Sequence, residues 1–160
     1  MTKGIIFDLD GTLIQLPVNY ETVQNNLKEF FNTSKNLKPL IPTIIKLSKN
    51  DQNKIDTSFD IICKEEVLAS KNFKIMADAV EILNFLKSKN LILCLVTMQC
   101  SDALEKILQK MEVLDLFDSI ISRDDSYDRF EQIKNSLKNI CLESSDVLMV
   151  GDRIHDVESA

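Results

Sequence analysis

Two carboxylates follow the first apolar segment of the chain, and their spacing suits catalysis. The segment Gly4–Leu9 is apolar apart from Asp8, and Asp10, Gly11 and Thr12 come directly after it. Asp8 and Asp10 are two residues apart, so an extended backbone would direct both side chains to one side. One carboxylate could then attack as a nucleophile while the other transfers a proton. Gly11 would let the chain turn sharply after them, because glycine has no Cβ.

More polar residues follow two later apolar segments. Asp152 and Asp156 lie in GDRIHD, directly after Val147–Val150, and Thr97 ends the segment Leu91–Thr97. If these segments are parallel strands, their carboxyl ends meet in one crevice, which is where open α/β sheets bind ligands. Carboxylates gathered there would raise one another's pKa values unless a cation compensates them. Because the ligands are all oxygens, the sequence predicts a Mg²⁺ site.

The elements that must position these residues alternate between two patterns. Continuous apolar runs are typical of strands buried on both faces of a parallel sheet, and segments with helical periodicity separate them. The alternation predicts an α/β fold built on a Rossmann-like, doubly wound parallel sheet. We predict strands at Gly4–Leu9, Leu91–Thr97, Phe117–Ser122 and Val147–Val150, and helices at Met76–Lys89, Asp102–Leu114 and Asp128–Ile140.

Residues 15–75 interrupt this alternation and are too long for an ordinary crossover between strands. We therefore expect a core formed by residues 1–14 and 76–160, and a small helical domain formed by residues 15–75. The chain ends at Ala160, shortly after the last predicted strand, so the core is either a minimal version of the fold or a fragment of it. Within the insertion we predict no strand and three helices, Tyr20–Lys35, Ile41–Lys49 and Asp56–Lys71.

Composition argues against several classes of protein. A net charge of -6 and a pI near 4.8 are unlike a nucleic-acid binder, which usually has a basic surface. No segment approaches the roughly 20 apolar residues of a membrane span, and no signal-peptide pattern is present. We therefore expect a cytoplasmic protein with neither nucleic acid nor membrane as a partner. The four cysteines lack metal-ligand spacing, so we predict reduced, unpaired thiols at Cys63, Cys94, Cys100 and Cys141.

The motifs together resemble those of a known family. DLDGT at residues 8–12, the strand end at Thr97 and GDRIHD at 151–156 are similar to motifs one, two and four of the haloacid dehalogenase-like hydrolase superfamily. The resemblance covers nearly the whole chain, and the insertion resembles the C1-type cap of the phosphoglycolate phosphatase-like branch. It implies a Mg²⁺-dependent phosphatase that hydrolyses a small phosphorylated metabolite through an aspartyl-phosphate intermediate. The dehalogenases lack the second aspartate, so Asp10 favours a phosphatase or phosphomutase.

The resemblance also implies a role for each matched residue. Asp8 would be the nucleophile, Asp10 would protonate the leaving oxygen and then activate water, and Thr97 would hydrogen-bond the phosphoryl oxygens. Asp8, the main-chain carbonyl of Asp10 and Asp152 would hold Mg²⁺. Asp156 would support the metal site directly or through water.

The third motif is the weakest match. The family places a lysine, often followed by proline, before the helix that precedes the last strand, whereas residues 122–134 read SRDDSYDRFEQIK. Arg129 is the nearest cation and could pair with Asp8 and phosphate through its guanidinium fork. Alternatively, Arg129 is a solvated charge in the first helical turn. Lys134 is a second candidate, which we expect to face solvent.

Two other functions stay open. A phosphomutase would use the same chemistry, but its intermediate must survive until a second hydroxyl group arrives. A catalytically impaired family member could instead act as a binding or regulatory module, which the missing Lys-Pro and the short C-terminus favour. The intact acidic set counts against that alternative. The sequence identifies neither the phosphorylated substrate nor the oligomeric state.

Overall fold

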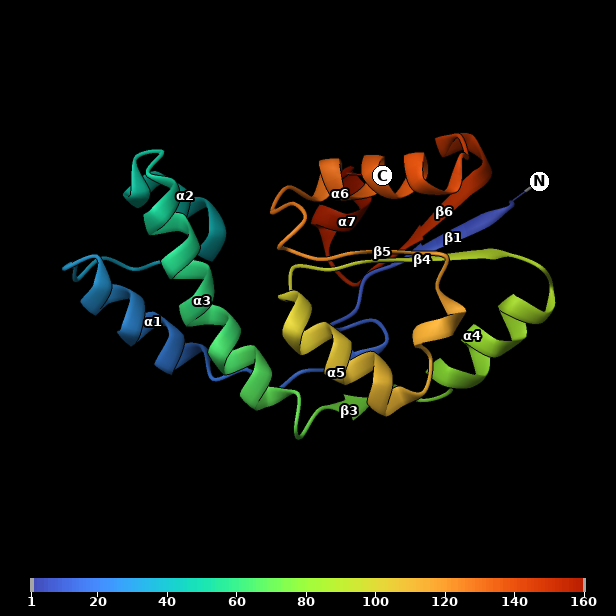
Figure 1. Ribbon diagram of the computed structural model, residues 1–160, viewed down its shortest axis with the longest axis horizontal. Helices are drawn as coiled ribbons and strands as arrows, with labels where there is room; N and C mark the ends of the chain where they lie inside the picture. Colours follow the sequence, from blue (N-terminus) through green and yellow to red (C-terminus); the bar gives the residue numbers. More distant parts are fainter. Residues whose placement is uncertain (1, 160) are drawn as a thin grey trace.

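A four-stranded parallel sheet forms the centre of the molecule (Figure 1). The computed structural model describes residues 2–159, apart from the side chains of His155 and Val157. The strand order β5-β4-β1-β6 places the first strand inside the sheet, and the predicted Rossmann-like α/β fold is confirmed. Three strands are shorter than predicted. Their bounds are β1 (Gly4–Phe7), β4 (Ile92–Val96), β5 (Ser119–Ile121) and β6 (Val147–Val150).

Helices cover both faces of the sheet (Figure 1). On one face, Ile5 and Phe7 pack in a core with residues of α4 and α5, and on the other Ile6 packs with Ile133 of α6. This alternation along β1 explains its continuous apolar sequence, because successive side chains enter opposite cores. The helices are α4 (Ala79–Ser88), α5 (Ser101–Met111), α6 (Arg129–Ile140) and α7 (Ile154–Ser159), with 3-10 turns η1 (Leu114–Leu116) and η2 (Ser144–Asp146) before the last two strands.

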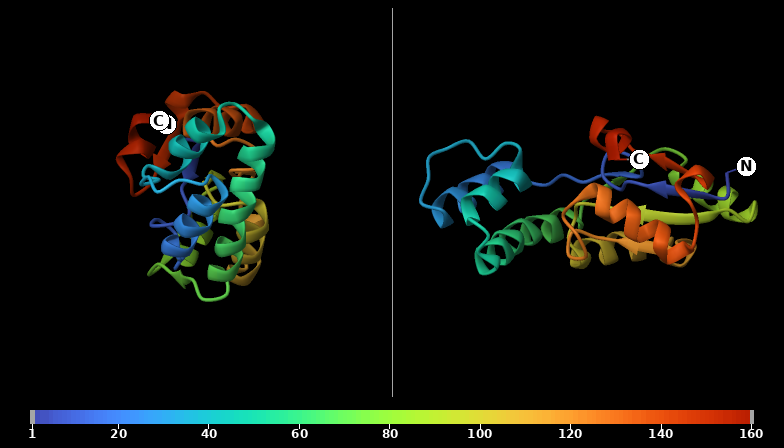
Figure 2. Two further views of the ribbon diagram at one scale, coloured as in Figure 1. Left: turned by 90° about the vertical axis from the view of Figure 1, so that its left-hand side faces the viewer. Right: turned by 90° about the horizontal axis from the view of Figure 1, so that it is seen from above.

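The insertion is helical as predicted and has an apolar core of its own. It contains α1 (Tyr20–Phe30), α2 (Leu40–Ser48) and α3 (Gln52–Ala69). Figure 2 shows these helices extending away from the sheet, at the end toward which its strands run. The side chains buried in their shared core are Val23, Leu27, Leu37, Ile44 and Ile62.

A short ribbon closes the base of the insertion. Strands β2 (Ile14–Gln15) and β3 (Lys74–Ile75) pair antiparallel, which brings the first and last residues of the insertion together. The prediction that the insertion region contains no strand is therefore wrong at its two ends. Each strand has only two residues, too few to produce a periodic pattern in the sequence.

The cysteines differ from the prediction of four unpaired thiols. Cys63 and Cys100 form a disulfide with their Cα atoms 5.6 Å apart, whereas Cys94 and Cys141 are free. The paired residues are separated by 37 positions, so their approach depends on how α3 packs against α5. Within residues 2–159, no helix is both long and apolar enough to cross a membrane. The cytoplasmic location stays a prediction.

Candidate active site

The predicted site residues lie where the parallel strands end. The backbone N–H of Asp8 donates to the carbonyl of Val150 at 2.9 Å, and that of Thr97 donates to the carbonyl of Ile121 at 2.9 Å. Asp8 thus extends the pairing of β1 with β6 by one residue beyond the regular strands, and Thr97 extends that of β4 with β5 in the same way. These ends of the sheet face the helical insertion (Figure 1).

Three carboxylates meet at this end of the sheet. Asp8, Asp152 and Asp156 each offer an oxygen atom, and these atoms lie within 4.8 Å of one another. Asp8 and Asp156 are buried, with 4% and 1% of their surface exposed, whereas Asp152 is exposed. Sequence segments more than 140 residues apart are brought together by the pairing of β1 with β6. This cluster therefore has both a buried side and a side open to a ligand.

Two glycines allow the carboxylates to approach the backbone. Gly11 has a φ of +91°, and a Cβ built there would collide with the carboxylate of Asp152. A Cβ at Gly151 would collide with Asp156 in the same way. Side chains at these positions would push the carboxylates out of the cluster, so the glycines of both motifs are required by close packing.

Arg129 provides the positive charge of the site. Its Nη2 donates to Asp8 Oδ1 at 2.8 Å, and its Nε lies 3.1 Å from Asp156 Oδ1. Only 4% of Arg129 is exposed, so the alternative of a solvated charge does not describe it. Asp128 caps α6 by accepting from the N–H of Glu131, which places Arg129 in the first turn. Lys134 is exposed and pairs with Glu131 instead.

The surroundings of Asp8 and Asp10 raise the pKa values of both carboxyl groups. Burial raises the pKa of Asp8 from 3.8 to about 6, against the opposing effect of Arg129 and with a further increase from Asp156. Burial also raises the pKa of Asp10, although its carboxylate accepts a hydrogen bond at 2.8 Å from the N–H of Leu16. Both groups are consequently easier to protonate than exposed aspartates.

Burial and nearby carboxylates also raise the pKa of one aromatic residue of the insertion. Burial and then the charges of Asp10 and Glu66 raise the pKa of Tyr20, the first residue of α1. Electrostatic interactions of this kind operate over short distances. The start of α1 therefore lies close enough to Asp10 and Glu66 for their charges to act on Tyr20.

Sequence reasoning missed two glutamines that hold the site together. The Thr97 hydroxyl donates to the side-chain oxygen of Gln99. The amide nitrogen of Gln132 donates to the carbonyl of Thr97 at 2.7 Å, and its oxygen accepts from Arg129 at 3.1 Å. Gln132 follows Arg129 by three residues and so shares its helix face, which is the one signal that the sequence offered.

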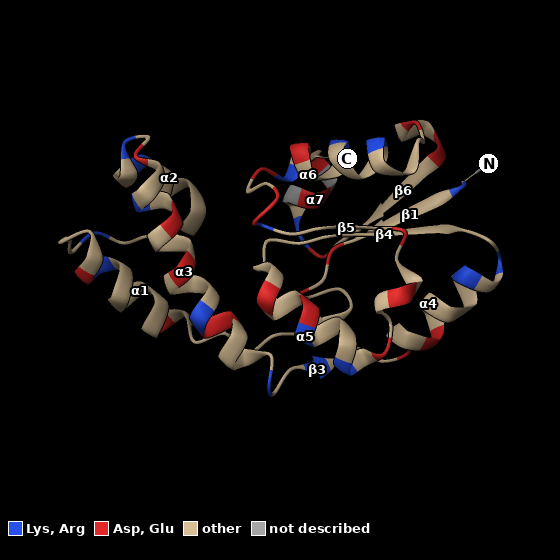
Figure 3. Ribbon diagram, in the orientation of Figure 1, with Lys and Arg blue, Asp and Glu red and all other residues tan. Residues whose placement is uncertain are grey.

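The three-carboxylate cluster fits a hard divalent cation. Mg²⁺ prefers oxygen ligands and is usually held by one or two carboxylates, with water completing its shell. Asp8, Asp152 and Asp156 supply such oxygens, and the exposure of Asp152 leaves room for water and a substrate. Arg129 neutralises part of the charge of Asp8 and Asp156. In Figure 3, acidic and basic residues occur together around the start of α6 and around α7.

The whole sequence was also compared with known protein families. The profile described as Haloacid dehalogenase-like hydrolase matches residues 5–160, from β1 to the end of the chain. The chain belongs to this family. It is therefore a hydrolase.

One relative is similar to the chain in sequence, and two solved structures are similar to it in fold. The chain is 29% identical over 173 residues to PpaX of Clostridium perfringens, named as a candidate pyrophosphatase, and the match covers 98% of this chain and 78% of that protein. The fold resembles a haloacid dehalogenase-like hydrolase from Bacteroides fragilis with a TM-score of 0.77, 19% identity and coverage of 100% and 83%. It also resembles a candidate phosphoglycolate phosphatase from Lactobacillus plantarum, with a TM-score of 0.74 and 19% identity. That match covers 100% of this chain and 82% of the other chain.

Proposed function

We propose that this hydrolase is a Mg²⁺-dependent phosphatase that acts on a small phosphorylated metabolite through an aspartyl-phosphate at Asp8. The observation that carries the proposal is the buried carboxylate of Asp8, which lies 2.8 Å from Arg129 and within 4.8 Å of the other cluster carboxylates. A nucleophilic carboxylate, a fixed cation and a set of oxygen ligands are the groups that phosphoryl transfer requires.

The surroundings of the acidic residues support the role proposed for each. Asp8 attacks phosphorus as the ionised carboxylate, which a pKa of about 6 leaves predominant at neutral pH. Asp10 protonates the leaving oxygen and then accepts a proton from the water that hydrolyses the aspartyl-phosphate. Burial raises the pKa of Asp10, which favours its use as an acid.

Arg129 and the Thr97–Cys100 loop, which we name the phosphate loop, would bind the phosphoryl group. Arg129 already faces Asp8 and can donate to phosphoryl oxygens through its guanidinium fork. Thr97 would exchange its hydrogen bond to Gln99 for one to a phosphoryl oxygen. Donors fixed in advance in this way stabilise the charge of the transition state without further reorganisation.

Asp8, Asp152 and the main-chain carbonyl of Asp10 would hold Mg²⁺, supported by Asp156. When bound, the cation supplies charge neutralisation for the transferring group and its carboxylate surroundings. The insertion, residues 15–75, would act as a cap over a core formed by residues 1–14 and 76–160. Its position at the carboxyl ends of the strands suits the exclusion of bulk water from the site. We also propose that the enzyme works in the cytoplasm.

The test is hydrolysis of para-nitrophenyl phosphate, with and without Mg²⁺, by the native protein and by Asp8→Asn. We expect Mg²⁺-dependent release of para-nitrophenol by the native protein and none by the variant. Trapping of phosphate on Asp8, detected by mass spectrometry after acid quench, would identify the intermediate. Equal release by both proteins would overturn the assignment of the nucleophile.

Pyrophosphate is a second candidate substrate, because the C. perfringens relative is named as a candidate pyrophosphatase. It should be assayed beside phosphorylated metabolites, since the same residues could attack either phosphoester or phosphoanhydride. Mg²⁺ binding measured by calorimetry, without turnover of any of these compounds, would instead favour the binding or regulatory module. Transfer to a second hydroxyl group rather than to water would favour a phosphomutase.

A further inference from the structure

The phosphate loop is fixed by two charged residues outside it. Nη1 of Arg123 donates to the carbonyl of Met98 at 2.7 Å, and the backbone N–H of Arg123 donates to the carbonyl of Gln99 at 3.1 Å. Glu66 Oε2 accepts from the N–H of Cys100 at 3.0 Å. Because peptide groups are planar and trans, fixing a carbonyl also fixes the direction of the next N–H. These contacts therefore orient the amides of Gln99 and Cys100, which donate to the Thr97 hydroxyl at 3.3 Å and to Glu66 at 3.0 Å, and so help to fix the hydroxyl that would face the phosphoryl group.

Glu66 and Arg123 also pair with each other across the boundary between the insertion and the core. The guanidinium donates from Nη1 and Nη2 to the two carboxylate oxygens at 2.8 and 2.9 Å. Both residues are buried, with 3% of the surface of Glu66 and 2% of that of Arg123 exposed. Glu66 belongs to α3, whereas Arg123 follows β5. We call this bidentate pair the Glu66–Arg123 clasp.

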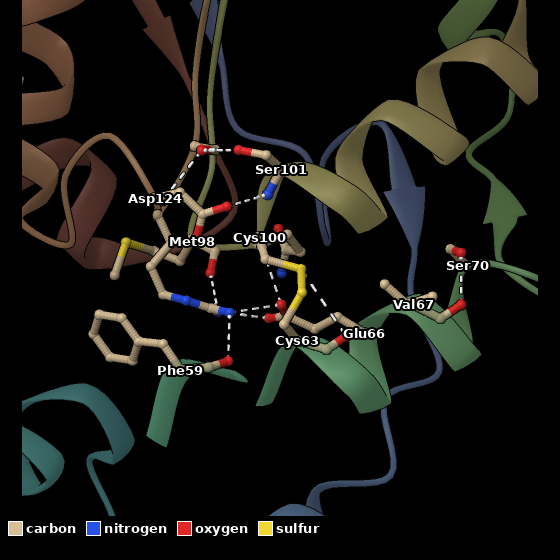
Figure 4. The surroundings of a disulfide bond; sticks show 12 residues. Phe59, Cys63, Glu66, Val67, Ser70, Met98, Cys100, Ser101 and Asp124 are labelled. Carbon is tan, nitrogen blue, oxygen red and sulfur yellow. Dashed lines mark hydrogen bonds and ion pairs between the residues drawn. A yellow bond between two sulfur atoms is a disulfide. The ribbon is translucent and has the colours of Figure 1, made fainter. Parts of the chain in front are cut away.

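The disulfide joins the same two parts of the molecule (Figure 4). Cys63 precedes Glu66 by three residues in α3, so both side chains lie on one face of that helix. Cys100 ends the phosphate loop and forms the N-cap of α5. A covalent bond and an ion pair thus hold α3 against the loop at adjacent positions.

We propose that Glu66 and Arg123 are positioning residues that couple docking of the insertion to the shape of the phosphate loop, and that the Cys63–Cys100 disulfide locks this docked state. The inference rests on the proposed function of the site. If α3 moves away, Arg123 loses both the carboxylate that offsets its charge and its contact with the ring of Phe59. Arg123 must then reorient, and the loop loses contacts at both Met98 and Cys100.

The lock is reversible by thiol–disulfide exchange with a small dithiol. A thiolate of the dithiol attacks Sγ of Cys63, which is half-buried, and the Sγ–Sγ bond breaks to release the thiolate of Cys100. The second dithiol sulfur then displaces Cys63, and the dithiol leaves as a cyclic disulfide. Two electrons pass from the dithiol to the disulfide, and its two protons are transferred to the cysteine sulfurs.

Hydrogen exchange tests the coupling without requiring catalysis. We compare the native protein and Glu66→Gln, each oxidised and reduced with dithiothreitol. The matched controls are Glu65→Gln, whose carboxylate makes no ion pair within the described residues, and Cys141→Ser, which removes an exposed free thiol. In reduced Glu66→Gln, exchange of the amides of residues 98–101 should rise about tenfold or more over that in reduced Glu65→Gln.

The effects of the clasp and the disulfide should be non-additive, because both hold the same contact. Either reduction alone or Glu66→Gln alone should change loop exchange only a few-fold, whereas together they should exceed the product of the single effects. In the same proteins, KM for para-nitrophenyl phosphate should rise about tenfold in reduced Glu66→Gln, with a smaller change in kcat, since the loop binds the phosphoryl group. Cys63→Ser should reproduce the effect of reduction and serves as a second, non-chemical route.

Two results would overturn the proposal: loop exchange in reduced Glu66→Gln equal to that in Glu65→Gln, or effects of the two changes that simply multiply. Circular dichroism spectra that match the native protein establish that each variant is folded before the comparison is made. If no protein in the set hydrolyses a phosphate compound, the proposed function fails. The exchange measurements still decide whether the clasp controls the loop.

Discussion

At the scale of single residues, the site depends on one buried cation shared by two buried carboxylates. Arg129 contacts Asp8 and Asp156 with different nitrogens, so it both orients the candidate nucleophile and offsets the charge of the cluster. A lysine in its place would offer a single ammonium group and could not reproduce both contacts with the same planar geometry.

Replacing Arg129 should therefore reduce catalytic activity more than it disturbs the fold of the protein. We expect Arg129→Gln to lower kcat for para-nitrophenyl phosphate about 10²-fold, the loss typical of removing one fixed donor to a developing charge. Arg129→Lys should keep part of this activity. Lys134→Gln, on the same helix but exposed, is the control and should behave as the native protein. A native kcat in Arg129→Gln would contradict the role of the arginine.

The acidity of Asp8 leads to a second prediction. Its pKa is about 6 in the folded protein and 3.8 in an unperturbed aspartate, which corresponds to about 3 kcal/mol. Because the folded value is raised, this contribution to stability is fully present below pH 3.8 and is lost as the pH rises through 6. Between pH 4 and 7, the free energy of unfolding of the Mg²⁺-free protein should therefore fall relative to that of Asp8→Asn.

Denaturant unfolding at several pH values measures this difference. Adding Mg²⁺ should reduce the fall, because a bound cation favours the ionised carboxylate. Parallel pH profiles for the native protein and Asp8→Asn, without Mg²⁺, would show that Asp8 is not the group responsible.

At the scale of elements, the turn after β1 is built around a backbone conformation that only glycine adopts readily. Gly11→Ala would be strained by its φ of +91°, and its Cβ would displace Asp152. We expect a loss of stability of about 1–3 kcal/mol and weaker Mg²⁺ binding, measured by denaturation and calorimetry. Gly4→Ala, at the other end of β1, should leave Mg²⁺ affinity unchanged although its Cβ is also tightly packed. Equal Mg²⁺ affinities for both variants would contradict the requirement for glycine at position 11.

At the scale of the whole molecule, the β2–β3 ribbon makes the insertion separable in principle. Gln15 pairs with Lys74, so replacing residues 16–73 by Asn-Gly would leave a short hairpin. We expect this variant to fold and bind Mg²⁺, with a lower Tm because Arg123 loses Glu66. Circular dichroism and calorimetry measure these properties. A variant that does not fold would contradict the division of the chain into core and cap.

The sequence alone determined the four strands of the parallel sheet, the alternation of strands and helices in the core, and the acidic residues at the strand ends. Those features are local: apolar runs reveal buried strands, and the carboxyl ends of parallel strands meet at one edge. It also placed helices in the insertion, although α1 ends at Phe30 rather than Lys35. There Asn32 has a φ of +47°, which ends the helical backbone without any proline or glycine to announce it.

Only the tertiary structure decided which charges are paired and buried. The sequence left Arg129 equally compatible with solvent and with the site, because a position in a first helical turn does not reveal what that turn faces. Glu66, Arg123 and the Cys63–Cys100 pair gave no signal, since their partners lie 37 or 57 positions away. Such contacts depend on how α3 packs against the core, and the physical reason is that pairing energy is set by distance and burial in three dimensions.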